Sequence, residues 1–277
     1  MADASPAPVG PLSLQRRVQS WWRKPSEMRA RAMRSRLQAL SGSLFRMGLS
    51  KTSAIYGAYQ PDSYFLAGQH REFDELFRRF ASHNRLNNGG DIPRLWALIL
   101  NCKQILEEKI PGDFAELGVW RGNTAAVLAS YADAPGRSVY LFDTYEGFDG
   151  EDLHGIDADK TMAFANTSVD VVRGVVGESR TNCIYVKGRF PGSIAAAHRE
   201  RQYALVSIDC DLYEPMKAAL EFFYPRMPRG GMLLLHDYSS LQWNGAKQAI
   251  DEFCRQSGEF IVLMPDKSGS AFVRKTA

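Results

Sequence analysis

Beyond residue 112, short apolar runs alternate with longer segments in which apolar positions recur at helical spacing. The apolar runs predict strands at 113–117, 138–142, 183–187, 203–208 and 231–235, and near 259–264 and 270–274. The helical patterns fall at 123–132, near 160–173, after Pro191, at 214–224 and at 244–256. Strands that alternate with helices predict an α/β fold with a doubly wound, mostly parallel sheet of seven strands. The last two strands leave no room for a crossover helix, so we expect an antiparallel pair there.

The first ninety residues have a different pattern and predict an N-terminal extension. Residues 1–12 are rich in Ala, Pro, Ser and Gly, which predicts a disordered tail. Residues 13–90 predict a helical extension, and the sheet domain is expected at 91–277. Aromatic residues recur in the extension at helical spacing, at Phe73, Phe77 and Phe80. This spacing is typical of a core or an interface, so we expect a homo-oligomer.

A basic arm at 13–40 makes the charge distribution uneven. Residues 1–40 hold eight Arg or Lys and two acids, whereas the remainder holds 26 basic and 29 acidic residues. One interpretation is a helix that binds a membrane surface or an anionic partner through Trp21, Trp22 and their basic neighbours. The other, which we favour, is an arm that packs on a neighbouring subunit. Because the rest of the chain is mildly acidic, no nucleic-acid partner is expected.

A glycine turn follows the strand at 113–117 and leads into a helix that begins at Asn123. Gly118 and Gly122 have no Cβ, so the backbone can adopt positive φ there and approach a ligand closely. Glu116 stands at the carboxyl end of the strand, where open α/β sheets bind their ligands. The free N–H groups of the following helix suit an anionic or polar ligand. The turn lacks the Gly-x-Gly-x-x-Gly spacing of a dinucleotide fingerprint and is closer to the first motif of S-adenosylmethionine (SAM)-dependent methyltransferases.

Polar residues end four of the predicted strands, and parallel strands bring these ends to one edge of the sheet. They are Glu116, Asp143, Asp209 with Asp211, and His236 with Asp237. A carboxylate at Asp143 can accept both hydroxyls of an adenosyl ribose. Asp209 and Asp237 can offer hard oxygen ligands to Mg²⁺, which would orient and acidify a substrate hydroxyl. Each acid can instead cap a helix, and Asp211 has that alternative for the helix that contains Pro215.

Taken together, five stretches resemble the macrocin-type O-methyltransferase family over residues 84–265. They are 112–122, 142–148, 187–191, 208–214 and 228–238. The resemblance implies a class I methyltransferase-like sheet and a SAM-dependent enzyme that methylates a hydroxyl, often on a sugar of a natural product, with Mg²⁺. It places Glu116, Gly118 and Gly122 at the SAM turn and Asp143 at the ribose. It places Asp209 and Asp237 at the metal.

One position departs from the family, which has a second acid directly before the aspartate of the fifth strand, where this chain has His236. Histidine is a poorer Mg²⁺ ligand than a carboxylate, so the site is expected to bind metal more weakly, to prefer Mn²⁺, or to use His236 as a base. The alternative is a histidine that is merely hydrogen-bonded at a strand end. His154, in the loop at 144–158, is a further candidate base, with a solvated loop histidine as the alternative.

Two aromatic residues and an arginine are further candidates for contact with ligands. Trp120 and Arg121 lie inside the turn and can line the cofactor, although Trp120 can equally be a core aromatic. Trp243 opens the helix after the fifth strand and can meet the acceptor. The cofactor candidates are therefore Glu116, Gly118, Trp120, Gly122 and Asp143.

Composition places the chain in a broad class. It has 277 residues, 45% of them hydrophobic, which suffices for a large core. Its four cysteines are far apart, with no Cys-x-x-Cys pair, so we expect neither a disulfide framework nor a zinc site, and a cytoplasmic location. No apolar run approaches the roughly 18 residues of a transmembrane helix, and the N-terminus does not resemble a signal peptide.

The resulting hypothesis is a SAM-dependent O-methyltransferase acting on a hydroxyl of a sugar or glycosylated metabolite with Mg²⁺ or Mn²⁺. The catalytic candidates are Asp209, His236 and His154, and the metal candidates are Asp209, Asp237 and His236. Two alternatives stay open at this point. One is a nucleotide-dependent oxidoreductase, and the other is a non-catalytic SAM-binding scaffold that docks through the basic arm.

Overall fold

The computed structural model describes Met33, Arg36 and residues 70–85, 87–133, 135–177 and 180–276. The chain divides into two compact units, 1–60 and 61–277, and the sheet with its covering helices belongs to the second. The predicted tail at 1–12 and all of the basic arm except Met33 and Arg36 lie outside the described residues. Of the predicted extension, the described elements of the second unit are the helix α4 (His70–Phe80) and a 3₁₀ turn at Asn88–Gly90.

Seven strands form one sheet in the order β3-β2-β1-β4-β5-β7-β6. Their bounds are β1 Asp113–Leu117, β2 Val139–Asp143, β3 Cys183–Lys187, β4 Tyr203–Ile208, β5 Met232–Leu235, β6 Val262–Leu263 and β7 Ala271–Arg274. Neighbours from β3 to β5 are parallel, whereas β7 is antiparallel to both β5 and β6. The predicted mostly parallel sheet with an antiparallel end is thus confirmed.

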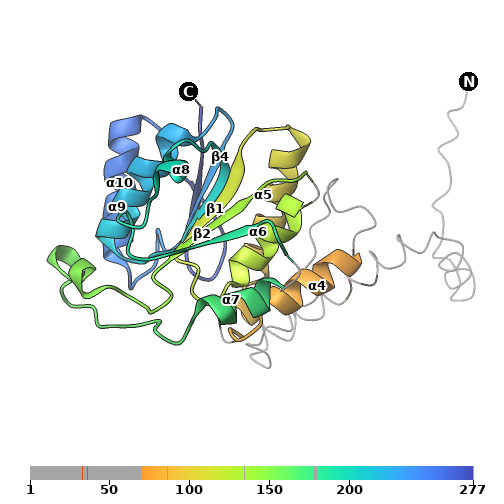
Figure 1. Ribbon diagram of the computed structural model, residues 1–277, viewed down its shortest axis with the longest axis horizontal. Coiled ribbons are helices and arrows are strands. Elements are labelled where there is room, and N and C mark those ends of the chain that lie inside the picture. Colours follow the sequence, from red (N-terminus) through yellow and green to blue (C-terminus); the bar gives the residue numbers. More distant parts are fainter. Residues whose placement is uncertain are drawn as a thin grey trace, which may run out of the picture. The chain divides into compact units, whose positions relative to one another are not determined.

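Helices cover both faces of this sheet (Figure 1). On one face lie α4, α5 (Ile92–Glu107), α6 (Asn123–Asp133) and α7 (Val169–Val176), whose buried residues share one core cluster. On the other lie α8 (Ala196–Arg199), α9 (Tyr213–Phe223) and α10 (Asn244–Ser257) with the second cluster. Besides the turn at Asn88–Gly90, the described residues form 3₁₀ turns at Gly150–Asp152, Gly155–Asp157 and Tyr224–Arg226. None of the described helices is long and apolar enough to cross a membrane.

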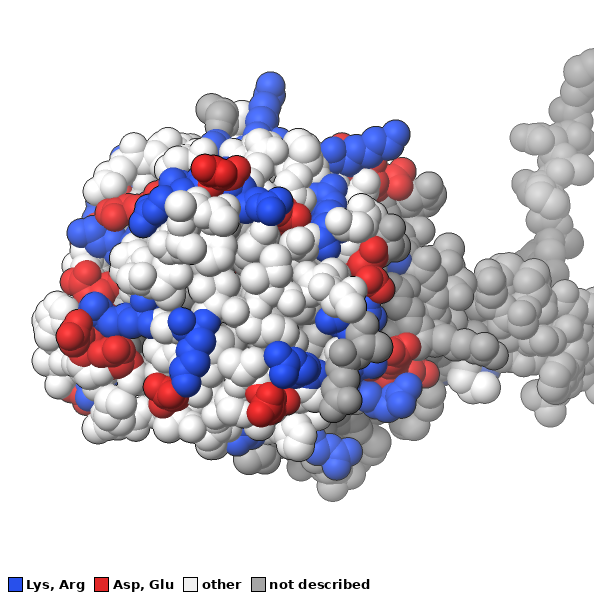
Figure 2. Space-filling view, viewed as in Figure 1, with Lys and Arg blue, Asp and Glu red and all other residues white. Residues whose placement is uncertain are grey.

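The two core clusters explain why the sequences of the central strands are continuous apolar runs. On β2, Val139 and Leu141 pack into the cluster of α5 and α6, while Tyr140 and Phe142 pack into that of α9 and α10. Successive side chains of a strand point to opposite faces, so a sheet covered on both sides needs apolar residues at every position. Over the face shown in Figure 2, basic and acidic side chains of the described residues are interspersed.

One helix begins later than the sequence pattern predicts. The expected helix near 160–173 is α7, which starts at Val169 because the Ser168 side chain accepts the Val171 N–H at 3.2 Å and caps it. The residues before Ser168 belong to the loop that joins β2 to α7. In that loop Phe148 and Phe164 pack against each other and line a cavity, so the helical spacing of its apolar positions was misleading.

Asp157 anchors the β2–α7 loop to the helical layer of α9 and α10. Its side chain is buried, and Oδ2 accepts the Tyr213 N–H at 2.7 Å, at the start of α9. A Cβ added to Gly245, in the first turn of α10, would lie 2.3 Å from the same oxygen. The glycine thus leaves the space that the carboxylate occupies.

We therefore expect Gly245→Ala to displace Asp157 and to lower the free energy of unfolding by roughly 2 kcal/mol. Gly174→Ala is the matched control, because Gly174 also lies in a helix but a Cβ there meets nothing within 4 Å. Alanine should be neutral or stabilising at that position by up to about 1 kcal/mol. Urea unfolding of both variants measures the difference, and equal stabilities would show that Asp157 needs no such space.

Candidate active site

A cavity of about 650 Å³ opens at the carboxyl ends of the central strands. β1 and β4 are neighbours, and the strand order runs away from them in both directions. Such a topological switch point leaves a crevice in which open α/β sheets bind ligands. Of the predicted site residues, Arg121, Gly122 and His154 do not line this cavity. Those that line it include Glu116, Gly118, Trp120, Asp143, Asp209, His236 and Asp237.

The turn after β1 depends on glycine at two places. Gly118 has φ +85°, and a Cβ there would lie 1.9 Å from the backbone oxygen of Asp209. Gly122 has φ +81°, and its Cβ would lie 2.8 Å from Cγ1 of Val172 on α7. The first glycine therefore lets β1 and β4 end close together, and the second lets α7 pack against the turn. Gly122 supports the turn from behind the cavity.

Asp143, at the end of β2, braces the glycine turn. Its Oδ2 accepts the Trp120 N–H at 2.8 Å, and its Oδ1 accepts the Tyr145 N–H at 2.6 Å. Burial raises the pKa of this carboxyl above its usual value, although these backbone N–H groups favour the charged form. The Thr144 hydroxyl also lies 3.4 Å from Oδ1, and the carboxylate lines the cavity, where it can accept a further hydroxyl.

Glu116 is almost wholly buried at the end of β1, and its Oε2 has no hydrogen-bond partner among the described residues. Burial, followed by the charge of Asp209, raises the pKa of this carboxyl well above its ordinary range. A buried polar atom without a partner is costly, and it lies where a ligand in the cavity can satisfy it.

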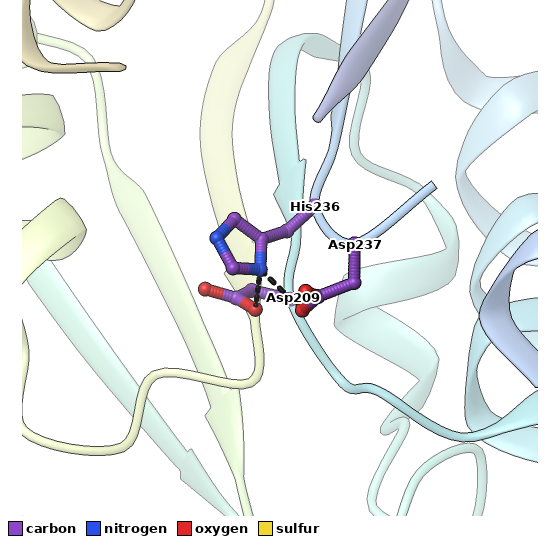
Figure 3. A group of neighbouring side chains, drawn as sticks. All are labelled: Asp209, His236 and Asp237. Carbon is purple, nitrogen blue, oxygen red and sulfur yellow. Dashed lines mark hydrogen bonds and ion pairs between the residues drawn. The ribbon is translucent and has the colours of Figure 1, made fainter. Parts of the chain in front are cut away.

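Asp209, His236 and Asp237 form an acid–imidazole cluster at the ends of β4 and β5 (Figure 3). His236 Nδ1 lies 2.7 Å from Asp209 Oδ1 and 2.5 Å from Asp237 Oδ2. Burial and the nearby Arg94 oppose a charged imidazole, but the two aspartates outweigh them and raise the pKa of His236 to about 10. Burial also disfavours the charge of Asp209, yet His236 and Arg94 lower its pKa to about 2.

The donor set of this cluster fits a divalent cation. One atom from each of the three residues lies within 4.8 Å of the others. All three converge on the position of the Nδ1 proton, so a cation would bind in exchange for that proton. Two carboxylates with one imidazole suit Mn²⁺ and other transition metals better than Mg²⁺, which prefers oxygen ligands alone.

Asp211 is not the cap of α9, so that alternative is wrong. The residue at the N-cap is Leu212, and the Tyr213 N–H is accepted by Asp157 instead. Asp211 has φ +62° and turns its buried side chain to Asp237, with which it shares a hydrogen bond. Burial, together with Asp209 and Asp237, raises the pKa of its carboxyl well above the usual range. It lines the cavity beside the cluster.

Arg94 is a site residue that the sequence reasoning missed. It lies in the first turn of α5, lines the cavity, and donates from Nη2 to Asp209 Oδ2 at 2.8 Å. The available signal was a single arginine in the otherwise apolar start of a buried helix, because a charge there needs a partner.

Of the candidates that lie in turns and loops, some line the cavity and others do not. Trp243 lines the cavity beside Phe148 and Phe164, with ring centroids 5.7 and 6.3 Å away. Arg121 does not line it but stacks 4.5 Å above the Trp120 ring. His154 lies outside the cavity, with Nε2 3.5 Å from Glu214 and Nδ1 2.9 Å from the backbone oxygen of Glu151. Its role as a base stays a prediction.

The family model of macrocin-O-methyltransferases matches residues 90–262, more than half of the chain. The chain belongs to this family. Among curated relatives, the 8-demethyl-8-(2,3-dimethoxy-alpha-L-rhamnosyl)-tetracenomycin-C 4'-O-methyltransferase of Streptomyces olivaceus is 31% identical over 53% of this chain and 61% of its own length. The mycinamicin III 3''-O-methyltransferase of Micromonospora griseorubida is 30% identical over 54% and 68%. The chain thus spans about three fifths to two thirds of these relatives.

Among solved structures, the O-methyltransferase NovP covers 75% of this macrocin-O-methyltransferase family member and 99% of its own chain, with a TM-score of 0.64 and 20% identity. The calicheamicin methyltransferase CalS11 covers 79% and 95%, with a TM-score of 0.57 and 21% identity. These likenesses confirm the predicted class I methyltransferase fold.

Proposed function

We propose that this chain is a SAM-dependent O-methyltransferase that methylates a hydroxyl of a sugar or glycosylated metabolite, with a divalent cation. The observation that carries the proposal is one cavity that joins the glycine turn to the acid–imidazole cluster. Family membership and the names of the relatives, which describe O-methyltransferases of rhamnosyl-tetracenomycin and mycinamicin, support it. A methyl transfer is an in-line displacement, so the protein contributes chiefly by positioning the donor and the hydroxyl.

The cofactor half of the cavity would hold SAM. In this proposal Gly118 brings the backbone close to the methionine portion, while Gly122 holds the turn against α7 and Trp120 lines the turn. Glu116 accepts a polar hydrogen through its unpartnered Oε2. Asp143, which lines the cavity at the end of β2, accepts the ribose hydroxyls.

The acceptor half would hold the hydroxyl beside the acid–imidazole cluster. Asp209, His236 and Asp237 would bind the cation, which when bound lowers the pKa of the hydroxyl and orients it. Asp211, buried beside Asp237, would take up the proton that the hydroxyl loses only where the bound cation lowers its raised pKa enough to ionise it. His236 would act as a base only after giving up the proton that the two aspartates hold on it, and His154 only if its loop moved.

Transfer of a labelled methyl group tests the proposal. The full chain is incubated with methyl-labelled SAM, Mn²⁺ and a panel of glycosides that carry free sugar hydroxyls. Label in a glycoside, placed on oxygen by NMR, is the expected result. SAM binding with no transfer to any glycoside would favour the non-catalytic scaffold, and transfer to nitrogen or carbon would refute the O-methyltransferase.

His236 should set the metal preference. We expect wild-type activity to be at least roughly tenfold higher with Mn²⁺ than with Mg²⁺ at equal subsaturating concentrations, because imidazole is a weak Mg²⁺ ligand. His236→Asp supplies a third carboxylate and should bring the two rates within roughly threefold of each other. EDTA should abolish the activity of both. Equal Mn²⁺ to Mg²⁺ ratios in the two proteins would exclude His236 as a ligand.

The homo-oligomer and the cytoplasmic location stay predictions, which analytical ultracentrifugation and cell fractionation would test. The docking role of the basic arm stays a prediction as well. Deleting residues 1–40 would test it, because unchanged oligomeric state and unchanged membrane binding would remove that role.

A further inference from the structure

We propose that Arg94 is a positioning residue that orients Asp209 and links the cofactor half of the cavity to the acid–imidazole cluster. The inference rests on the proposed function, in which Asp209 binds the cation. The Arg94 side chain is only 11% exposed, and its Nη2 contacts two groups. It donates to Asp209 Oδ2 at 2.8 Å and to Thr124 Oγ1 at 3.3 Å.

Arg94 is a fixed cation in an acidic surrounding. Burial disfavours its charge, but the carboxylates of Asp209, Asp91 and Asp266 outweigh that cost and raise its pKa above the usual value. A guanidinium does not lose its proton in a protein. Arg94 therefore acts through its charge and its directional N–H groups and not by transferring a proton.

The hydrogen bond from Arg94 gives the two Asp209 oxygens different partners. Oδ2 accepts from Arg94, while Oδ1 lies 2.7 Å from His236 Nδ1. The carboxylate can rotate only by giving up one of these contacts. Asp209 thus presents a single oxygen toward His236 and Asp237, and Arg94 prevents it from chelating a cation through both.

Arg94 is itself held in place from two directions. Its backbone N–H donates to Asp91 Oδ1 at 3.3 Å, and the same oxygen accepts the Lys267 N–H at 3.2 Å from a loop that lines the cavity. Thr124 belongs to the first turn of α6, directly after the glycine turn. If α6 shifts when the cofactor binds, the Arg94 side chain would therefore transmit the movement from Thr124 to Asp209.

The test uses Arg94→Met, Arg94→Lys and a matched control. Arg137→Met is the control, because the Arg137 guanidinium also donates to two groups, here the backbone oxygens of Gly112 and Ile110, but lies at the amino end of β1, away from the cavity. For each protein we would measure kcat, the KM for SAM, the Mn²⁺ Kd by electron paramagnetic resonance, and the thermal midpoint.

Arg94→Met should lower kcat at least roughly 30-fold while the KM for SAM stays within about threefold. At the same time it should tighten Mn²⁺ binding at least roughly threefold, because a positive charge is lost and the second oxygen of Asp209 becomes available. Arg94→Lys keeps the charge but loses the planar fork, so it should restore wild-type Mn²⁺ affinity and only part of kcat. Arg137→Met should change only the thermal midpoint.

Two results would overturn the role of Arg94. One is an unchanged kcat in Arg94→Met. The other is a loss of Mn²⁺ affinity and kcat in Arg94→Met that Arg137→Met also shows when its thermal midpoint falls by the same amount. If the wild-type protein binds no Mn²⁺, the proposed cation is wrong. The role of Arg94 then depends on whether Arg94→Met lowers kcat while the KM for SAM stays unchanged. If no methyl transfer is found, the proposed function fails. The role of Arg94 then depends on whether Arg94→Met binds Mn²⁺ more tightly than the wild-type protein.

Discussion

Alanine at Gly118 is expected to abolish SAM binding and to lower the free energy of unfolding by roughly 3 kcal/mol or more. The added Cβ would lie 1.9 Å from the backbone oxygen of Asp209, and backbone cannot yield as a flexible side chain does. β1 and β4 would have to separate at the point where the cavity opens. The positive φ of +85° adds about 1 kcal/mol of strain for any residue with a Cβ.

Gly136→Ala separates these two causes. Gly136 also has a positive φ, +69°, but a Cβ there meets nothing within 4 Å. The free energy of unfolding of Gly136→Ala should fall by about 1 kcal/mol, and its affinity for SAM should stay unchanged. Urea unfolding and calorimetric titration of SAM measure both quantities. A Gly118→Ala protein that resembles Gly136→Ala would show that close approach to Asp209 is not what the turn requires.

The second large effect is expected for Asp209→Asn, which should lower kcat by roughly 100-fold or more while SAM binds within about threefold of wild type. The amide removes a charged ligand from the proposed cation site and leaves the buried Arg94 without the carboxylate that it pairs with. Breaking a buried ion pair from one side is costly, and the free energy of unfolding should fall by roughly 2–4 kcal/mol.

Asp170→Asn serves as the control for charge removal. Asp170 pairs with Arg173 at 3.2 Å on the surface of α7, with both side chains largely exposed. Exposed pairs contribute about 0–1 kcal/mol, so its loss should leave both stability and kcat nearly unchanged. Wild-type kcat in Asp209→Asn would remove Asp209 from the chemistry and with it the metal-assisted mechanism.

Much of the fold was predictable because each central strand has apolar residues on both faces and each is followed by a turn and a helix. The predicted β1 at 113–117 and β3 at 183–187 agree with the observed bounds. The loop at 144–168 was less predictable, since its aromatic residues pack on Trp243, far away in the sequence. Apolar spacing alone does not distinguish such a loop from a helix.

The candidate site was predictable where the strand ends carry the chemistry. Asp143, Asp209, His236 and Asp237 are each the last residue of a parallel strand or one of the next two, and topology alone brings them to one edge. Arg94 was missed because it reaches Asp209 from a helix 115 positions earlier, and only packing brings them together. Tertiary contacts of this kind leave no periodic signal in the sequence.

Calorimetric titration of SAM into the full chain, and of NAD into a second sample, tests the central claim most directly. Each titration is run with Mn²⁺ and again with EDTA. The proposed function predicts that SAM binds in both conditions and that NAD binds in neither, because the glycine turn suits the methyl donor and lacks the dinucleotide spacing. Binding of NAD without SAM, or of neither ligand, would contradict it.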